Sequence, residues 1–355
     1  MKALQLQAIG QVALVDVGQP AVGENDLLIK TGAATICTSD LHDIRANPFG
    51  IALPVVLGHE GAGVVAATGA HVRGFQAGDR VATHPVHPCG TCVHCRAGMA
   101  HLCRDMGHLG INMQGTFAEY YVVRADRARH IPQDVPFTVG ALAEPVCVCL
   151  EALAQANLPP GGRLLVIGDG PFGVLIARLA QGLLVQGLPA QGLPVQFLHP
   201  GEVVIAGRHD FRLGFARGAV PVNVIKAATP LARLRAQAGE TGYDAVVLAV
   251  GSAQAVREGQ ALLRPKGRLV VFAAMPGETP VDLFDLHMRE LEIVGACNDQ
   301  DRLDEAVERL ADPALGLGEL VTHTFPLAAY REALELAERG HESATKVAFV
   351  FNEED

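Results

Sequence analysis

Four cysteines within a short segment have the spacing that most clearly predicts a metal site. They follow the pattern C-x2-C-x2-C-x7-C and are Cys89, Cys92, Cys95 and Cys103. Four thiolates supply the ligand number and the softness of a closed tetrahedral Zn²⁺ site. Because a closed shell leaves no position for a substrate, we expect this ion to stabilise a lobe, at about residues 84–106, and to take no part in chemistry.

Other interpretations of this cluster are less favoured. An iron–sulfur protein of ferredoxin type would carry a second cysteine-rich segment, and this sequence has none. A zinc ribbon that grips nucleic acid disagrees with the net charge of −10. Three histidines lie close to the cysteines, but four thiolates already fill the shell, so we expect solvated loop residues at His84, His87 and His94.

A second group of residues combines sulfur, oxygen and nitrogen donors. Residues 37–42 contain a thiol, a hydroxyl, a carboxylate and an imidazole, and residues 58–61 add an imidazole and a carboxylate between glycines. Either segment alone is weak evidence, because a single cysteine is more often a small core residue and a single histidine a satisfied polar group. The candidates are Cys37, Ser39, Asp40, His42, His59 and Glu60.

A glycine-rich turn predicts a dinucleotide site. Residues 168–173 read G-D-G-P-F-G, follow the apolar run 163–167 and open the helix-like segment 174–180. In that context the glycines allow a tight turn and let the backbone approach a pyrophosphate, whose charge the helix N-terminus favours. We therefore expect cofactor contacts from Gly168, Gly170, Pro171, Phe172 and Gly173.

The end of the next strand, 203–206, bears on the choice between NAD and NADP. An acidic residue there would hold the ribose hydroxyls, whereas a basic residue would accept a 2′-phosphate. Gly207 occupies the usual acidic position, and the guanidinium of Arg208 is suited to bidentate phosphate contact, so NADP is preferred. NAD is kept as the alternative because Asp210 follows and an insertion obscures the register.

That insertion is a five-residue repeat over residues 181–200. Its glycines and prolines recur at spacings that would break a helix. We interpret it as a surface loop that extends into solvent, with a specific interface element as the less favoured alternative.

Two hydrophobic patterns divide the chain. Up to about residue 123, short apolar alternations broken by Gly and Pro predict antiparallel β structure. From about residue 150, apolar runs alternate with segments of helical length, which predicts a doubly wound parallel sheet. The apolar runs are 163–167, 203–206, 244–250 and 268–272, and further elements are expected at 293–296, 303–311, 320–322 and 346–351.

Composition restricts the class of partner. Apolar residues make up 49% of the chain and charged residues 19%, which predicts a globular protein with a large core. The net charge of −10 disfavours nucleic acid and anionic membrane surfaces, leaving a small molecule. No apolar run reaches the roughly 18 residues of a membrane span, and residues 1–7 lack the features of a secretory signal, so we expect a cytoplasmic protein with reduced cysteines.

Together these motifs resemble the zinc-dependent medium-chain dehydrogenase/reductases along essentially the whole chain. The resemblance is carried by Cys37-x-Ser39-Asp40-x-His42, Gly58-His59-Glu60, Gly78-Asp79-Arg80-Val81, the spaced cysteines, Glu144-Pro145 and the glycine-rich turn. The sequence is most similar to the polyol (sorbitol) and threonine dehydrogenase branch. The resemblance implies an α/β fold with a mainly β GroES-like domain over 1–149, a Rossmann domain over 150–290 and a return to the first domain over 291–355, assembled as a homodimer or homotetramer.

The resemblance also implies a catalytic Zn²⁺ besides the structural one, giving two per chain. Cys37 and His59 would bind it, with Glu60 or Glu144 as the third protein ligand. Cys147 is a rival third ligand, less favoured because the Glu-Pro pair is intact. The vacant fourth position would accept water or the substrate oxygen and stabilise a zinc-bound alkoxide.

Three further residues near this metal receive roles from the resemblance. Asp40 would orient the His59 ring, and Ser39 and His42 would relay the hydroxyl proton past the cofactor ribose to solvent. The implied reaction is hydride transfer between an alcohol or polyol-type substrate and NAD(P). Two alternatives are a zinc alcohol or aldehyde dehydrogenase of primary alcohols and an inactive NADP-binding regulatory protein.

Overall fold

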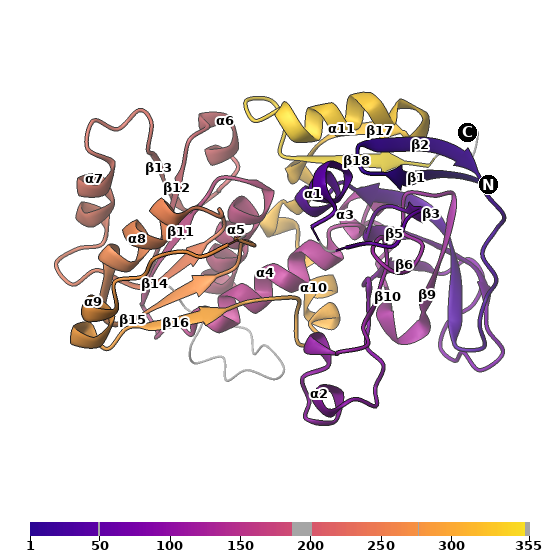
Figure 1. The fold of residues 1–355 in the computed structure, drawn as a ribbon, viewed down its shortest axis with the longest axis horizontal. Coiled ribbons are helices and arrows are strands. Elements are labelled where there is room, and N and C mark those ends of the chain that lie inside the picture. Colours follow the sequence, from indigo (N-terminus) through magenta and orange to yellow (C-terminus); the bar gives the residue numbers. More distant parts are fainter. Residues whose placement is uncertain (49, 187–200, 276, 352–355) are drawn as a thin grey trace. The chain divides into compact units, whose positions relative to one another are not determined.

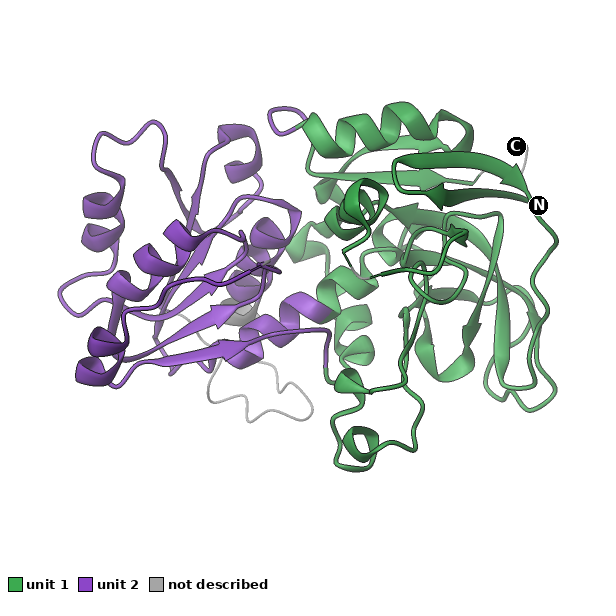
Figure 2. Ribbon diagram, viewed as in Figure 1, with its two compact units in different colours: residues 1–147, 300–340, 344–355 green, residues 148–299, 341–343 purple. Residues whose placement is uncertain are grey.

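The computed structural model describes residues 1–48, 50–186, 201–275 and 277–351. Within these ranges the chain forms two compact units, drawn in green and purple in Figure 2. Unit 1 comprises residues 1–147, 300–340 and 344–355, and unit 2 comprises residues 148–299 and 341–343. Residues 187–200 of the predicted 181–200 loop lie outside the described residues. Residues 181–186 end an α-helix, so the loop prediction is wrong for them.

Unit 1 is built mainly from antiparallel strands (Figure 1). Its strands are β1 (Lys2–Ala8), β2 (Gln11–Asp16), β3 (Asp26–Thr35), β4 (Val55–Val56), β5 (Glu60–Thr68), β6 (Arg80–Thr83), β7 (Val86–His87), β8 (Gly107–His108), β9 (Tyr120–Arg124), β10 (Ala128–His130), β17 (Val321–Pro326) and β18 (Lys346–Val350). The main sheet has the order β10-β6-β5-β3-β18-β17, with β9 also paired to β3, and smaller sheets have the orders β2-β1-β4 and β7-β8. The antiparallel prediction for this part of the chain is confirmed.

Strand β3 lies at the centre of this sheet. Leu27 and Ile29 point to the same face, as the two-residue period of a strand requires, and pack in a core cluster with Val65, Val81 and Val123. At its far end β3 pairs antiparallel with both β5 and β18. The chain returns after residue 300 to supply β17 and β18, so the C-terminal segment completes the sheet from which the candidate metal ligands emerge.

Short helices surround the strands of unit 1. They are α1 (Thr38–Ala46), α2 (Val93–Arg96), η1 (Ala100–Leu102), η2 (Ala125–Arg127), α3 (Phe137–Gly140), α10 (Leu303–Leu310), η4 (Pro313–Leu315), η5 (Leu317–Leu320), η6 (Leu327–Ala329) and α11 (Tyr330–Arg339). Helix α4 (Ala143–Ala156) starts in unit 1 and continues into unit 2. The stretch Phe137–Ala156 is long and apolar enough to cross a membrane, but 72% of its most apolar window is buried, which is typical of a core helix.

Unit 2 is a parallel sheet with the strand order β13-β12-β11-β14-β15-β16. Its strands are β11 (Arg163–Ile167), β12 (Glu202–Gly207), β13 (Val220–Asn223), β14 (Tyr243–Leu248), β15 (Leu263–Val271) and β16 (Glu292–Gly295), and its helices are α5 (Pro171–Gln186), α6 (Asp210–Leu213), α7 (Pro230–Gln237), α8 (Ala253–Leu262) and α9 (Leu283–Arg289). The predicted doubly wound fold is confirmed. Strand order reverses between β11 and β14, the point where such sheets bind nucleotides.

Strand β16 belongs to this sheet because it pairs in parallel with β15 from Arg268↔Glu292 to Val271↔Gly295. The sheet therefore extends past residue 290, where the sequence analysis places the domain boundary. The short, isolated apolar run at 293–296 gives no sign of its partner strand, so the sequence alone does not assign it to a sheet.

Candidate metal and cofactor sites

Two neighbouring strand ends bring Cys37, His59 and Glu60 together. Thr35, at the end of β3, pairs with Glu60, at the start of β5, so the residues after one strand and before the other are adjacent. Their possible ligand atoms all lie within 4.8 Å of one another, and all three residues are buried. Sulfur, nitrogen and oxygen donors thus converge at one point in unit 1.

Asp40 fixes the orientation of the His59 ring. Its Oδ1 lies 3.3 Å from His59 Nδ1, and its Oδ2 accepts a hydrogen bond of 2.8 Å from the Cys37 backbone N–H. The other ring nitrogen, Nε2, lies 3.4 Å from Ser39 Oγ. Burial lowers the pKa of His59, but the nearby Asp40 and Cys37 groups outweigh it and raise this pKa well above its usual value. Because the Asp40 carboxylate holds Nδ1, Nε2 is the nitrogen available to a metal, and binding there would release its proton.

Glu60 makes a buried ion pair that the sequence analysis did not predict. Its carboxylate accepts hydrogen bonds from Thr35 Oγ1 and from Lys346 Nζ, whose distance to Oε1 is 2.5 Å. Lys346 begins β18 and is itself 3% exposed. The Glu60 charge is thus neutralised by a lysine that no local motif connects to it.

Glu144 lies near the start of α4 and is buried. Its Oε2 has no hydrogen-bond partner within the described part of the chain. Burial raises its pKa to about 7, opposed by the charges of His59 and Lys346. Neither Glu144 nor Cys147 belongs to the described group formed by Cys37, His59 and Glu60, although both are buried.

The donor set at this site fits a zinc ion. Burial raises the pKa of the Cys37 thiol, so a thiolate there requires a cation to stabilise it. Mixed sulfur, nitrogen and oxygen donors suit Zn²⁺, and the orphaned oxygen of Glu144 is available to a further ligand or water. His42, on the same helix as Ser39, is exposed, and the described contacts of the chain include no hydrogen bond between the two.

The four spaced cysteines form one cluster. The Sγ atoms lie within 4.8 Å of one another, with 3.5 Å between Cys92 and Cys95 and 3.9 Å between Cys92 and Cys103. Four sulfurs held tetrahedrally at Zn–S distances of about 2.3 Å would be about 3.8 Å apart. The arrangement therefore fits a closed Zn²⁺ shell.

Backbone N–H groups already point at these sulfurs. Cys89 N lies 3.3 Å from Cys103 Sγ, and Cys92 N lies 3.3 Å from Cys89 Sγ. Backbone hydrogen bonds lower the pKa of Cys92 to about 6, whereas burial and the neighbouring thiols raise that of Cys95 to about 12. The four groups would ionise together only with a cation among them.

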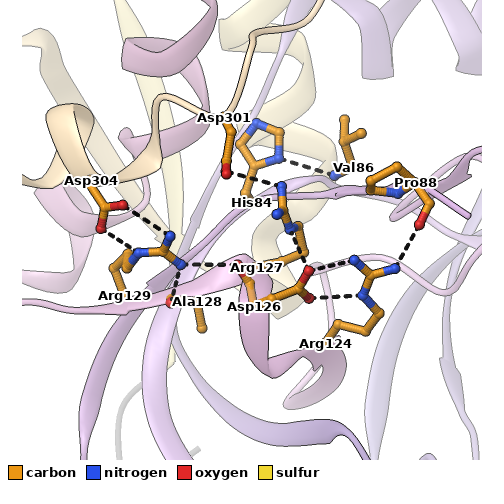
Figure 3. Close-up of polar contacts among 10 residues, drawn as sticks. All are labelled: His84, Val86, Pro88, Arg124, Asp126, Arg127, Ala128, Arg129, Asp301 and Asp304. Carbon is orange, nitrogen blue, oxygen red and sulfur yellow. Dashed lines mark hydrogen bonds and ion pairs between the residues drawn. The ribbon is translucent and has the colours of Figure 1, made fainter. Parts of the chain in front are cut away.

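Arg124 ties the base of the cysteine lobe to the sheet (Figure 3). Its Nη1 donates a hydrogen bond of 2.7 Å to the carbonyl of Pro88, the residue before Cys89. Its Nε and Nη2 donate to the two carboxylate oxygens of Asp126, at 2.8 and 2.5 Å. This paired geometry holds the guanidinium in one orientation, and with it the point where the lobe begins.

Two further arginines link the same region to the returning chain (Figure 3). Arg127 Nη1 lies 3.3 Å from Asp301 Oδ1, and Arg129 contacts both carboxylate oxygens of Asp304 in α10. Both pairs join residues more than 170 positions apart in unit 1, so they fasten the C-terminal segment beside the lobe.

The expected solvated histidines near the cysteines are only partly found. His84, between β6 and β7, and His87, within β7, are buried, at 3% and 7% exposure. Burial lowers the pKa of His87 to about 4, so it is neutral. His94 is more exposed, and its Nδ1 lies 2.6 Å from the Leu102 carbonyl. The expectation is thus wrong for His84 and His87, and none of the three belongs to the cysteine cluster among the described residues.

The glycine-rich turn connects β11 to α5 in unit 2. Gly168 has φ +125°, a value that side chains disfavour, and a Cβ at Gly173 would collide with the Gly168 carbonyl. A Cβ at Gly170, by contrast, would meet no heavy atom within 4 Å. Pro171 and Phe172 open the helix. Two glycines thus shape the turn and a third leaves open space above the backbone, as a pyrophosphate requires.

Gly207 ends β12, and the exposed Arg208 follows it. Asp169, which lies within the glycine-rich turn, is a further candidate that the glycine motif does not predict. Its Oδ2 accepts hydrogen bonds of 2.6 Å from both the Arg208 and the His209 backbone N–H groups. Its signal in the sequence is an acidic side chain between two glycines of the motif, Gly168 and Gly170.

Comparisons with known proteins agree with this geometry. A family model described as "Alcohol dehydrogenase GroES-like domain" matches residues 23–133, and one described as "Zinc-binding dehydrogenase" matches residues 199–312. A curated relative, L-threonine 3-dehydrogenase of Edwardsiella ictaluri, is 31% identical over 96% of this chain and 97% of its own length.

Two solved structures of 26% sequence identity are similar over 99% of both chains. One is described as a short chain alcohol dehydrogenase of Escherichia coli CFT073 complexed with NADH, with a TM-score of 0.88. The other is a zinc-binding dehydrogenase of Sinorhizobium meliloti 1021 bound to NADP, with a TM-score of 0.86.

Proposed function

The chain belongs to the zinc-type medium-chain dehydrogenases of the alcohol dehydrogenase superfamily, and we propose from this premise that it transfers hydride between an alcohol or polyol-type substrate and a nicotinamide dinucleotide. Relatives of at least 30% identity are named as dehydrogenases. The observation that carries the proposal is the buried group formed by Cys37, His59 and Glu60. The Asp40 carboxylate lies beside Nδ1 of the His59 ring. Such a set of donors suits a catalytic metal better than a structural one, because it leaves the shell incomplete.

Cys37 and His59 are the proposed ligands of this metal. When bound, Zn²⁺ supplies a Lewis acid that lowers the pKa of a substrate hydroxyl. Asp40 keeps the imidazole in one orientation and one tautomer, with Nε2 directed toward the ligand site. The four-cysteine lobe is the proposed site of a second, structural Zn²⁺.

Glu60 is the favoured third ligand and Glu144 the alternative. The carboxylate of Glu60 lies with Cys37 and His59, but it also pairs with Lys346. Glu144 has an oxygen without a partner in the described residues and is therefore free to accept a hydrogen bond from water or substrate. In this proposal Glu60 binds the metal, and Glu144 accepts a hydrogen bond from the substrate or water.

Ser39 and His42 are the proposed proton path. The Ser39 hydroxyl faces the ligand nitrogen of His59, and His42 lies one helical turn further along α1 with its ring exposed. A hydroxyl near the metal can accept the substrate proton, and an exposed imidazole can pass it to water.

NADP is the proposed cofactor on the basis of Gly207 and the exposed Arg208, with NAD as the alternative. Cytoplasmic location and a homodimer or homotetramer are proposed with it.

A substrate panel tests the proposed function directly. Purified protein supplied with Zn²⁺ is assayed with primary alcohols, secondary alcohols, polyols and sugars, and NADH and NADPH formation is followed by absorbance. Turnover of polyols or other secondary alcohols supports the proposal. Turnover of primary alcohols alone supports the alcohol or aldehyde dehydrogenase alternative, and no turnover with any class supports the inactive regulator.

A further inference from the structure

The carboxylate of Asp169 occupies an anion-binding position formed by the chain itself. Its Oδ2 accepts hydrogen bonds of 2.6 Å from the backbone N–H groups of Arg208 and His209. His209 Nδ1 lies 3.1 Å from the same oxygen. One carboxylate oxygen therefore takes three nitrogen contacts just past the end of β12, and Asp169 is only 8% exposed.

This position is surrounded by groups that favour negative charge. Successive backbone N–H groups that point to one place make an anion-binding concavity. The guanidinium of Arg212 is close enough for the Asp169 charge to raise its pKa, although burial lowers that pKa overall. The exposed side chain of Arg208 adds a further cation at the same strand end. Without Asp169, the backbone N–H groups of Arg208 and His209 would be available to another anion.

Gly207 makes room for this arrangement. A Cβ at Gly207 would lie 2.6 Å from Asp169 Cγ and Oδ2 and would collide with Asp169 Cβ. Gly207 stands where this strand usually ends in an acidic residue. The carboxylate of Asp169, from the glycine-rich turn, lies against the Gly207 backbone instead. The negative charge at the end of β12 thus comes from the glycine-rich turn and not from the strand itself.

The end of this strand is also where a dinucleotide of this fold presents its adenine ribose, with a 2′-hydroxyl in NAD and a 2′-phosphate in NADP. We propose that Asp169 is a specificity-determining residue that opposes the 2′-phosphate, because its carboxylate occupies the backbone donors that the phosphate would use and repels its charge. Asp169 thus acts against Arg208, and the balance of the two sets the ratio of NADPH to NADH affinity. This inference rests on the proposed function, since it requires that unit 2 binds a nicotinamide dinucleotide.

A purely structural role for Asp169 predicts a different result. The three contacts of Asp169 also fasten the glycine-rich turn to β12, and loss of that link alone would loosen the pyrophosphate site. Both dinucleotides share the pyrophosphate, so a structural role weakens them equally. Only a role at the 2′ position changes the ratio of their affinities.

The test is the equilibrium dissociation constant of NADH and of NADPH, measured by fluorescence titration of the Zn²⁺-supplied protein at fixed ionic strength. Adenosine 2′,5′-bisphosphate and adenosine 5′-monophosphate, measured by calorimetry, isolate the 2′ group from the nicotinamide. The variants are Asp169→Ala, which empties the position, and Asp169→Asn, which removes the charge and keeps an acceptor. Glu290→Gln is the matched control, because it removes an exposed charge of unit 2 that pairs with Lys266 and has no role in the proposed cofactor site.

We expect Asp169→Ala to shift the affinity ratio toward NADPH by about tenfold or more, with a smaller shift in Asp169→Asn and about twofold at most in Glu290→Gln. Adenosine 2′,5′-bisphosphate should gain affinity and adenosine 5′-monophosphate should not. If Asp169→Ala does not fold, Gly207→Ala carries the test, because its Cβ displaces the carboxylate and should shift the ratio in the same direction.

An equal loss of both dinucleotides overturns the inference and leaves the proposed function intact, and so does an unchanged ratio. Failure of the wild-type protein to bind any dinucleotide or adenosine phosphate overturns both.

Discussion

Lys346 and Glu60 form an ion pair in the interior of unit 1, although 286 positions separate them in the sequence. Glu60 is fully buried and Lys346 is 3% exposed. The antiparallel pairing of β3 with both β5 and β18 brings them together. The pair neutralises a carboxylate within the proposed metal site, so the C-terminal strand contributes to the electrostatics of residues near the N-terminus.

Loss of this lysine should destabilise the protein strongly. In Lys346→Met the Glu60 charge stays buried without its partner, which costs about 3–5 kcal/mol. Lys346→Arg, which keeps the charge, should lose less. The measurement is thermal unfolding of Zn²⁺-saturated protein, with Lys2→Met as control, because the exposed Lys2–Asp16 pair is worth about 0–1 kcal/mol. Equal melting temperatures for Lys346→Met and Lys2→Met would show that the buried pair does not stabilise the fold.

The cysteine lobe should depend on its own metal. In Cys95→Ser one sulfur of the cluster is replaced, and we expect one Zn²⁺ per chain to be lost while the other remains. Without the ion, residues 89–103 have little buried core to hold them, so limited proteolysis should cut there first. Cys297→Ser, at an exposed cysteine outside both groups, is the control and should behave as wild type. Full Zn²⁺ content in Cys95→Ser would contradict the assignment.

Asp43 should make stability depend on pH. Burial and the nearby Asp40 charge raise its pKa to about 6 from the ordinary value of 3.8 for an aspartate. The folded state therefore binds more protons than the unfolded state between these values, and its stability falls as pH rises through this window. Asp43→Asn does not titrate, so its stability relative to wild type should increase with pH, by up to about 3 kcal/mol at 1.36 kcal/mol per pKa unit.

The measurement is the melting temperature of both proteins between about pH 4.5 and 8. Asp16→Asn is the control: the Lys2 hydrogen bond lowers the pKa of Asp16, so its difference from wild type should be flat over this range. A difference between Asp43→Asn and wild type that shrinks as pH rises would have the wrong sign for a raised pKa.

Arg208 should act on one dinucleotide only. Its exposed guanidinium follows β12 and is free to contact a 2′-phosphate, so Arg208→Asp should weaken NADPH by about tenfold and spare NADH. Fluorescence titration with both dinucleotides measures this, and Arg217→Asp, at another exposed arginine of unit 2, is a matched control. Equal effects on NADPH and NADH would remove Arg208 from the 2′ site.

The sequence predicted those features that local spacing encodes. Cysteine spacing, the glycine-rich turn after an apolar run and the change of hydrophobic period each depend on neighbouring residues. The antiparallel and parallel sheets and the clustering of the four spaced cysteines accordingly agree with the structure. The close approach of Cys37 and of Asp40 to His59 came from the resemblance and is also seen.

The features that the sequence did not reveal depend on distant contacts. Lys346 meets Glu60 only through strand pairing across the whole unit, and His84 is buried by packing that no local pattern reports. The same explanation applies to Asp169 in unit 2. Its hydrogen bonds depend on where β12 ends relative to the glycine-rich turn, 39 positions earlier. Tertiary structure determines each of these contacts, and no local pattern in the sequence predicts them.

The central claim is that Cys37 and His59 hold a catalytic metal distinct from that of the cysteine lobe. Elemental analysis of wild type, Cys37→Ser and Cys297→Ser, each purified with Zn²⁺ supplied and assayed on the same alcohol and polyol panel, tests it most directly. The account predicts two Zn²⁺ per chain in wild type and Cys297→Ser, and one Zn²⁺ with no turnover in Cys37→Ser. Two Zn²⁺ and full turnover in Cys37→Ser would contradict it.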